Sequence, residues 1–263
     1  MSWLRAIFLA KRSPRLAQLQ AVPPCLDRPV CVIGDVHGRL DLLDRLLAEV
    51  AERPESRLAR IILVGDMIDR GPDSAGVLAR VHALQRAAPE RVICLMGNHE
   101  RMLLDLLYSP ARHGPRWIAA GGSETMTSFG LSPWVRRQDS ESMIGLAKDL
   151  RSAMTDELVD WLAALPLIWR EDRLAVSHAG ADPAHDIDKQ AEKRLLWGAQ
   201  GREADMRGDG VWVAHGHNIV PKAGVQRQKI TLDTGAWCSG RLSAVWVDVK
   251  GPSFIEVSGP KYP

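Results

Sequence analysis

Carboxylate, imidazole and amide side chains occur together in three short segments of this sequence, each of which begins with a glycine. The segments are GDVHG from Gly34, GDMIDRG from Gly65 and GNHE from Gly97. Oxygen ligands combined with imidazole suit manganese, iron or zinc better than calcium. Asp35 and His37 are two positions apart, so both can bind one cation if an extended strand continues through them. The segments therefore indicate a metal site built from several loops.

Each of these residues also has an ordinary structural explanation when it is taken alone. Asp35 could be only the N-cap of the following helix, and Asn98 only a turn residue. Asp69 and Arg70 could form a surface ion pair with little effect on stability. Three such segments in succession are much harder to explain in this way, so we favour the metal site.

A predicted strand precedes each segment and a predicted helix follows it. The strands are expected at 29–33, 61–64 and 91–96. Apolar residues at helical spacing place the helices at 40–50, 75–88 and 101–107. Three consecutive strand–loop–helix units favour a mainly parallel sheet whose ligands gather at the carboxyl ends of its strands.

The rest of the chain divides into a helical middle and a strand-rich second half. Residues 109–165 have little strand signal, and we expect them to form a helical insertion that caps one edge of the sheet. Strand signal returns in four segments, at 174–176, 211–213, 229–232 and 242–249. A sandwich of two sheets with outer helices accommodates both halves, and one large mixed sheet is the alternative.

Length and composition are those of a folded protein with one large α/β domain. We place this domain at residues 27–258 of the 263, after an N-terminal basic segment of residues 1–26. The formal net charge is only +2, and 34 Lys and Arg residues are interleaved with 32 Asp and Glu residues along most of the chain. A nucleic-acid partner would require a basic face, so none is predicted.

Neither a transmembrane segment nor a disulfide framework is predicted. No apolar run approaches the roughly 20 residues that span a bilayer. The four cysteines show no CxxC spacing, and they are expected to be reduced core thiols. Both observations favour a cytoplasmic location. The basic segment is expected to pack on the domain as a helix or tail, and a weak association with a membrane surface is the alternative.

The order and spacing of GDVHG, GDMIDRG and GNHE resemble the phosphoprotein phosphatases of bacterial type, within the calcineurin-like metallophosphoesterases. SHAG at 177–180, HGHN at 215–218 and LDTGAWCSGRL from Leu232 are similar to later motifs of that family, so the resemblance spans roughly residues 29–249. It implies an α/β fold, the calcineurin-like sandwich of two mixed sheets flanked by helices. It also implies a metal-dependent phosphatase, with a serine/threonine protein phosphatase as the first expectation.

The resemblance implies two divalent metal ions, with manganese as the first choice and iron or zinc as alternatives. The implied ligands are, for the first ion, Asp35, His37 and Asp66, and, for the second ion, Asp66, Asn98, His178 and His217. Asp66 would bridge the two ions through its two oxygens. His217 is preferred to His215 because it follows the glycine as in the family motif, whereas spacing alone leaves both open. His215 is then expected to lie behind the ligands or to face solvent.

The chemistry implied is hydrolysis by an activated water molecule. Two cations lower the pKa of a shared water and neutralise the phosphate oxygens as charge builds up. His99 resembles the general acid of the family, and Asp69 would orient it and favour its imidazolium form. Arg70 would bind the phosphate oxygens with a fork of N–H groups, and Asn98 and Arg202 are further candidates for substrate contacts. No covalent phosphoenzyme is required.

One departure from the family pattern concerns the substrate side of the site. Bacterial relatives carry an arginine two residues after a tryptophan, where it makes a second contact with the phosphate, but here Ala199 follows Trp197 at that distance. Arg194 or Arg202 could substitute. Asn218 also replaces the threonine of the family's GHT motif. These changes bear on substrate preference more than on the metal centre.

Two other functions stay open at the level of the sequence. A bis(5'-nucleosyl)-tetraphosphatase or another nucleotide hydrolase would use a similar core. Trp117, Phe129 and Trp134 could then stack on a base, although aromatic residues at such spacing are more often part of the core. A non-catalytic phosphate-binding scaffold is disfavoured because the implied ligand set is intact.

Overall fold

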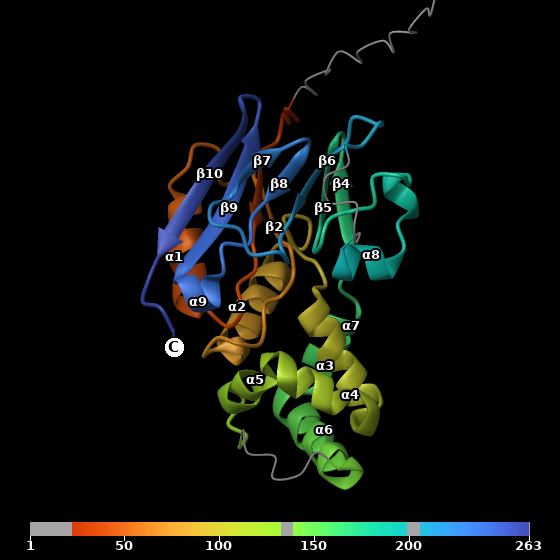
Figure 1. The fold of residues 1–263 in the computed structure, drawn as a ribbon. Helices are drawn as coiled ribbons and strands as arrows, with labels where there is room; N and C mark the ends of the chain where they lie inside the picture. The colour runs from red at the N-terminus through yellow and green to blue at the C-terminus, as the bar shows by residue number, and fades with distance from the viewer. Residues whose placement is uncertain (1–22, 133–138, 199–205, 263) are drawn as a thin grey trace, which may run out of the picture.

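Two five-stranded sheets pack face to face in the computed structural model, which describes residues 23–132, 139–198 and 206–262 (Figure 1). The first sheet has the order β10-β9-β1-β2-β3, with β1 (Val30–Ile33), β2 (Arg60–Leu63), β3 (Val92–Cys94), β9 (Arg241–Asp248) and β10 (Gly251–Ser258). The second has the order β4-β5-β6-β8-β7, with β4 (Ile168–Glu171), β5 (Leu174–Ser177), β6 (Trp212–His215), β7 (Gly224–Gln226) and β8 (Lys229–Thr231). The predicted sandwich is confirmed, and the alternative of one large sheet is excluded.

Both sheets are mixed. β1, β2 and β3 are parallel, as the three strand–loop–helix units predicted, whereas β9 runs antiparallel to β1 and forms a hairpin with β10. In the second sheet β5, β6 and β8 are parallel, and β4 and β7 are antiparallel edge strands. The carboxyl ends of the parallel strands of both sheets therefore carry the loops that hold the predicted segments.

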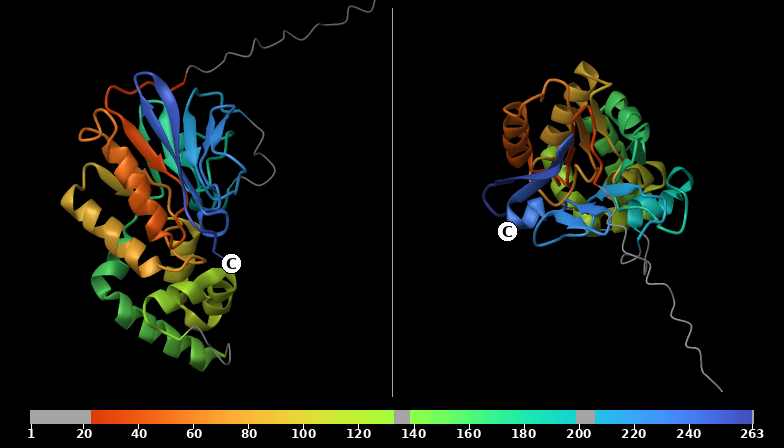
Figure 2. Two further views of the ribbon diagram at one scale, coloured as in Figure 1. Left: turned by 90° about the vertical axis from the view of Figure 1, so that its left-hand side faces the viewer. Right: turned by 90° about the horizontal axis from the view of Figure 1, so that it is seen from above.

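The helices fall into an outer layer and a separate group. The larger helices are α1 (Leu40–Ala51), α2 (Ser74–Ala87), α3 (Asn98–Tyr108), α4 (Pro110–Trp117), α5 (Ser123–Ser128), α6 (Ser140–Met154) and α7 (Asp156–Ala163). The shorter ones are a π-helical turn (Ile118–Gly122), a 3-10 turn (Ile187–Lys189), α8 (Glu192–Trp197) and α9 (Ala236–Ser239). α1 and α2 cover the first sheet, contacting β9, β10 and β3 (Figure 2), and α3 to α7 gather beyond its end (Figure 1).

Alternation along the strands builds two apolar layers. In β1, Val30 and Val32 lie in the core between the two sheets, while Cys31 and Ile33 lie in the core between the first sheet and the helices. Successive side chains of a strand point to opposite faces, so a strand that is buried on both faces is apolar throughout. Leu26, ahead of β1, also lies in the core between the sheets.

Two expectations about the limits of elements are wrong. The strand does not continue through the GDVHG segment, because β1 ends at Ile33 and His37 has a φ of 44°. The helix expected at 101–107 begins at Asn98, because the Glu100 side chain accepts a hydrogen bond of 2.8 Å from the backbone N–H of Gly97 and closes the first turn.

The cysteines do not all lie in the core. Cys31 and Cys94 are buried as expected, but Cys25 is exposed and Cys238 is only half-buried. None of the four forms a disulfide. Within the described ranges, every helix is too short or too polar to span a bilayer.

Candidate metal centre and active site

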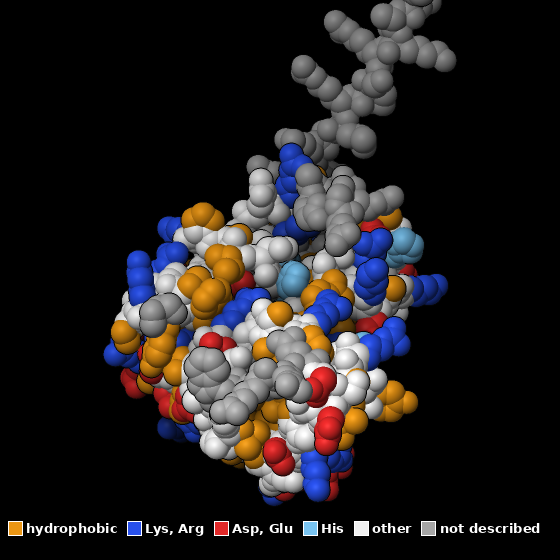
Figure 3. Space-filling model, turned by 60° about the horizontal axis from the view of Figure 1, so that its bottom comes forward, with side chains coloured by type: hydrophobic (Ala, Val, Ile, Leu, Met, Phe, Trp, Pro, Cys, Tyr) orange, Lys and Arg blue, Asp and Glu red, His pale blue; other side chains and the backbone are white. Residues whose placement is uncertain are grey.

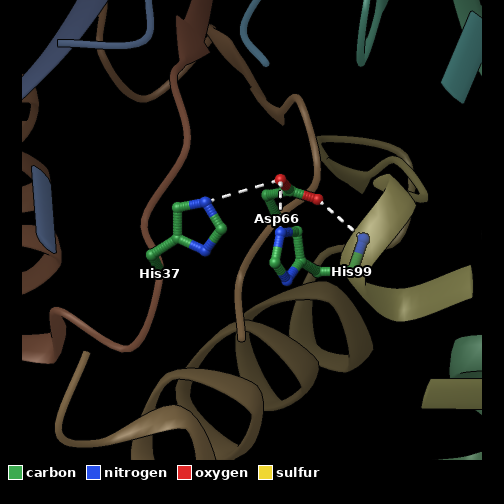
Figure 4. Close-up of side chains that lie close together, drawn as sticks. All are labelled: His37, Asp66 and His99. Carbon is green, nitrogen blue, oxygen red and sulfur yellow. Dashed lines mark hydrogen bonds and ion pairs between the residues drawn. The ribbon is translucent and has the colours of Figure 1, made fainter. Parts of the chain in front are cut away.

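Side chains from five loops meet at the carboxyl ends of the parallel strands. His37 follows β1, Asp66 follows β2, and His99 lies in the first turn of α3. His178 and His217 follow β5 and β6. They form two groups of three residues whose ligand atoms all lie within 4.8 Å of one another. The His37 group contains His37, Asp66 and His99 (Figure 4), the His217 group contains Asp66, His178 and His217, and Asp66 belongs to both.

Tight backbone contacts bring these loops together. Gly65 has a φ of 98°, and a Cβ at this position would lie 2.3 Å from the backbone nitrogen of Gly97. A Cβ on Gly216 would lie 1.6 Å from Oδ1 of Asp35. Only glycine tolerates such approaches without displacing its neighbour. The loops therefore pack against one another closely enough for their side chains to share a site.

Two of the imidazoles are oriented by backbone carbonyl groups. His37 Nδ1 lies 2.7 Å from the carbonyl oxygen of Ile68, and His178 Nδ1 lies 3.2 Å from that of Val64. A carbonyl oxygen can only accept, so Nδ1 carries the proton and the lone pair of Nε2 faces Asp66, at 3.4 and 3.5 Å respectively. Burial lowers the pKa of His37 to about 3 and that of His178 to about 4. Neutral imidazoles oriented in this way are suited to binding a metal.

Lone pairs converge in the His217 group. Asn98 Oδ1 lies 2.7 Å from His178 Nε2 and 2.9 Å from His217 Nδ1. The two ring nitrogens are 3.1 Å apart. Asn98 Oδ1, His178 Nε2 and His217 Nδ1 all face one another, and one proton on the His217 ring cannot form a full hydrogen bond with both other atoms. A cation could accept a lone pair from all three. Two imidazoles, an amide oxygen and the Asp66 carboxylate form a donor set that suits a transition-metal ion.

Asp35 and Asp233 are buried beside these groups, in addition to the buried carboxylate of Asp66 within them. Burial raises the pKa of Asp35 well above its ordinary value, and the charges of Asp233 and Asp66 raise it further. Burial also raises the pKa of Asp233, to about 6. Carboxylates held together in a dry site need a compensating positive charge to stay ionised. The buried charges therefore fit a metal centre as well.

Asp35 lies beside the two groups and belongs to neither. Both of its carboxylate oxygens accept from the backbone N–H of His217, at 3.0 and 3.2 Å. In the group with His37 and Asp66, the third residue is His99 and not Asp35. The structure thus gathers five of the six predicted metal ligands around Asp66, with His37 in one group and Asn98, His178 and His217 at the other, and leaves Asp35 one hydrogen bond away.

His99 differs from the other imidazoles because a carboxylate faces its Nδ1. Asp69 Oδ2 lies 2.7 Å from that nitrogen, and Thr125 donates to the other oxygen of Asp69 at 2.6 Å. Burial alone would lower the pKa of His99, but the charge of Asp66 and the hydrogen bond with Asp69 together raise it above its ordinary value. A protonated imidazole is a proton donor and a poor metal ligand.

Arg70 is held at the edge of the His37 group. Its Nη1 lies 3.1 Å from Nε2 of His37, and its guanidinium carbon lies over the ring of Trp237, 5.5 Å from the ring centroid. Its backbone N–H donates to the carbonyl oxygen of Gly121 at 3.0 Å. The guanidinium is thus fixed where it can meet an anion at the ligand groups.

The remaining candidates divide into buried residues and residues outside the described ranges. His215 is buried and lies in neither ligand group, so it does not face solvent. Trp117 is completely buried and presents no face for a base, whereas Phe129 is half-buried and packs against the core. Arg202 and Trp134 fall at positions outside the described residues.

The supporting roles of Glu100 and Thr125 were missed at the sequence level. Glu100 accepts from the backbone N–H groups of Asp66, Met67 and Gly97 at 2.8 to 2.9 Å, so it ties the loop after β2 to the start of α3. The spacing of Glu100 three residues after Gly97 is a capping signal that predicts part of this role. Thr125 carries no such signal.

Residues 28–240 match the model of one protein family, which is described as calcineurin-like phosphoesterase. The chain belongs to this family. It is therefore a hydrolase of phosphoric esters, as the three motifs predicted.

Several members and structural neighbours of this phosphoesterase family are similar along most of the chain. The serine/threonine-protein phosphatase 2 of Salmonella typhimurium is 30% identical, over 83% of this chain and 92% of the relative. The asymmetrical bis(5'-nucleosyl)-tetraphosphatase of Oceanobacillus iheyensis is 26% identical, over 81% of this chain and 86% of the relative. A serine/threonine phosphatase structure from Saccharomyces cerevisiae shares the fold, with a TM-score of 0.57 at 15% identity, over 92% of this chain and 85% of that one.

Proposed function

We propose that this phosphoesterase hydrolyses phosphate monoesters with two divalent metal ions, and that phosphorylated serine and threonine side chains are its substrates. The observation that carries the proposal is the shared carboxylate of Asp66, which belongs to both ligand groups. The proposed ligands are Asp35, His37 and Asp66 for one ion, and Asp66, Asn98, His178 and His217 for the other. Manganese is the first choice and iron or zinc the alternative, because the donors combine carboxylate, amide and imidazole groups.

Each side chain then has a distinct task. When bound, the two ions would lower the pKa of a nearby water molecule and offset the charge of the phosphate oxygens. Arg70 binds the phosphate through its N–H groups and orients it. His99 donates a proton from Nε2 to the leaving alkoxide, while Asp69 holds the ring and stabilises its charged form. Asn98 is a further substrate contact in this proposal.

We prefer a protein substrate to a dinucleotide because the similarity to the protein phosphatase extends along most of both chains. The protein phosphatase relative is 30% identical and is matched over 92% of its length, against 26% and 86% for the asymmetrical tetraphosphatase. The symmetrical bis(5'-nucleosyl)-tetraphosphatase of Serratia proteamaculans is 31% identical, but over only 60% of this chain and 44% of the relative. Hydrolysis of dinucleoside polyphosphates is the second candidate, supported by the tetraphosphatase relative.

We also propose that residues 27–258 form one phosphoesterase domain in which 109–165 is a helical insertion. The bond between the backbones of Arg70 and Gly121 supports this, because it ties the insertion to the loop after β2. A cytoplasmic location and the packing of the N-terminal basic segment stay predictions.

One assay panel tests the substrate. Protein reconstituted with manganese is compared on a phosphoserine peptide and on diadenosine tetraphosphate, at matched concentrations. We expect the higher kcat/KM for the peptide. A higher kcat/KM for the dinucleotide would establish the second candidate and contradict the first.

A further inference from the structure

Two arginine–tryptophan pairs flank the proposed metal centre. The guanidinium carbon of Arg70 lies 5.5 Å from the ring centroid of Trp237, and that of Arg116 lies 4.5 Å from the ring centroid of Trp197. The Trp197 ring in turn meets His217 nearly at a right angle, with 6.3 Å between the ring centroids. Each of the two ligand groups therefore has a guanidinium in its neighbourhood.

The fold holds Arg116 in place while its side chain stays exposed. Arg116 lies in the last turn of α4, where Gly114 and Trp117 are buried, and its partner Trp197 is the half-buried last residue of α8. Among the residues that the structure describes, no carboxylate lies within ion-pair distance of Arg116 and no acceptor bonds its guanidinium. Helices α4 and α8 thus fix the position of the Arg116 guanidinium, and none of the described residues neutralises its charge.

The position of Arg116 over the Trp197 ring leaves its N–H donors available. A guanidinium packed on an indole ring uses its flat face, so the N–H groups around its edge can still donate to an anion. Figure 3, in which the lower side of the molecule comes forward, shows a histidine side chain at the surface with basic side chains on both sides of it. This face therefore offers positive charge on two sides of an imidazole.

The two arginines differ in their distance from the ligand groups. Arg70 contacts the ring of His37 directly, at 3.1 Å, whereas Trp197 lies between Arg116 and His217. A phosphate at the ligand groups is within reach of Arg70, and an anion next to that phosphate is better placed for Arg116. We propose that Arg116, positioned by Trp197, binds a second anionic group of the substrate. The inference rests on the proposed phosphomonoesterase function.

The second anionic group has two possible sources with the same chemistry. In a phosphopeptide it is an acidic side chain close to the phosphoserine. In a dinucleoside polyphosphate it is the neighbouring phosphate. Both present oxygens that accept two parallel hydrogen bonds from a guanidinium.

Replacing Arg116 by methionine tests the inference, because Arg116→Met keeps a long apolar side chain on Trp197 and removes the charge and the donors. Wild type and variant are compared on two phosphoserine peptides that differ only in glutamate or glutamine next to the phosphoserine. We expect wild type to favour the glutamate peptide by about fivefold in kcat/KM, and Arg116→Met to reduce this ratio to below about twofold. A second arm compares diadenosine tetraphosphate with p-nitrophenyl phosphate. If the second anion is a neighbouring phosphate, Arg116→Met should reduce the ratio of kcat/KM between these two substrates.

Arg112→Met is the matched control. Arg112 is exposed on the same helix one turn earlier, so its variant should keep the wild-type ratios. Arg116→Lys should keep part of the preference, because it restores the charge without the planar fork. Binding can be measured by calorimetry on metal-loaded protein with non-hydrolysable phosphonate analogues of the two peptides. The ratio of their dissociation constants should fall in Arg116→Met as the ratio of kcat/KM does.

The outcomes separate the inference from the proposed function. If Arg116→Met retains the wild-type ratios in both arms, or if wild type has no preference in either arm, the inference is wrong. If wild type hydrolyses none of these phosphate esters, the proposed function fails, and the phosphonate binding ratios still decide whether Arg116 recognises a second anion.

Discussion

The chemistry of three histidines in the site, His37, His178 and His99, follows from the group that faces the Nδ1 atom of each. His37 and His178 face backbone carbonyl oxygens, which support a neutral ring with a free Nε2 lone pair. His99 faces the carboxylate of Asp69, which supports the charged ring. The same side chain is therefore suited to binding metal at two positions and to donating a proton at the third.

Replacing His99 by asparagine should lower turnover while the metal content stays unchanged. General acid catalysis contributes roughly 10²- to 10⁴-fold, and poor leaving groups need the proton most. We expect a large loss of kcat on a phosphoserine peptide and a much smaller loss on p-nitrophenyl phosphate. Metal analysis of the same preparations provides the check, because an emptied metal site in His99→Asn would make His99 a ligand and not the acid.

Replacing Asp66 by asparagine should weaken the binding of both ions together, because both ligand groups contain its carboxylate. The measurement is the number of ions retained per chain after dialysis. Asp139→Asn serves as the control, since Asp139 only caps the exposed start of α6 and asparagine caps a helix equally well. Loss of a single ion from Asp66→Asn would show that the carboxylate does not bridge.

At the scale of secondary-structure elements, the helices between α3 and β4 help to position the proposed catalytic residues. The carbonyl oxygen of Gly121 receives the backbone N–H of Arg70, and the hydroxyl of Thr125 donates to Asp69. Both contacts reach the loop after β2 from one short stretch that includes the π-helical turn. The insertion is thus part of the site as well as a cover for the sheet.

Gly121→Ala should therefore raise KM for a phosphate ester. Gly121 has a φ of 108°, and a Cβ there would lie 2.8 Å from Cγ of Arg70, so alanine would displace the guanidinium. Gly130 offers a matched control, because it also has a positive φ, of 76°, but a Cβ there meets nothing within 4 Å. Both variants should lose about 1–3 kcal/mol of stability from backbone strain. An equal KM in the two variants would contradict the positioning role of Gly121.

The same elements show what could be predicted from the sequence. β1, β2 and β3 were found because continuous apolar runs end at a glycine, and the residues after them carry most of the candidate ligands. β4, β7 and β10 were missed, since they are edge strands that include exposed residues and lack such runs. Thr125, Trp237 and Arg116 were missed for another reason: they meet Asp69, Arg70 and Trp197 only through tertiary packing, which no local spacing in the sequence indicates.

At the scale of the whole molecule, the ligand groups exist only because the two sheets are packed together. The bond between the carboxylate of Asp35 and the backbone of His217 joins loops of the two sheets that are 182 positions apart in the chain. Apolar side chains from both sheets form the layer behind these loops. The fold thereby brings buried carboxylates and neutral imidazoles together, so that metal affinity is tied to the integrity of the fold.

The central claim is that hydrolysis depends on two metal ions held by these residues. The most direct test is a titration in which protein that a chelator has stripped, and that metal analysis shows to be metal-free, receives manganese while hydrolysis of a phosphoserine peptide is followed. We predict no turnover without metal and a rise that saturates at two bound ions per chain. Full turnover by the metal-free protein would contradict the claim.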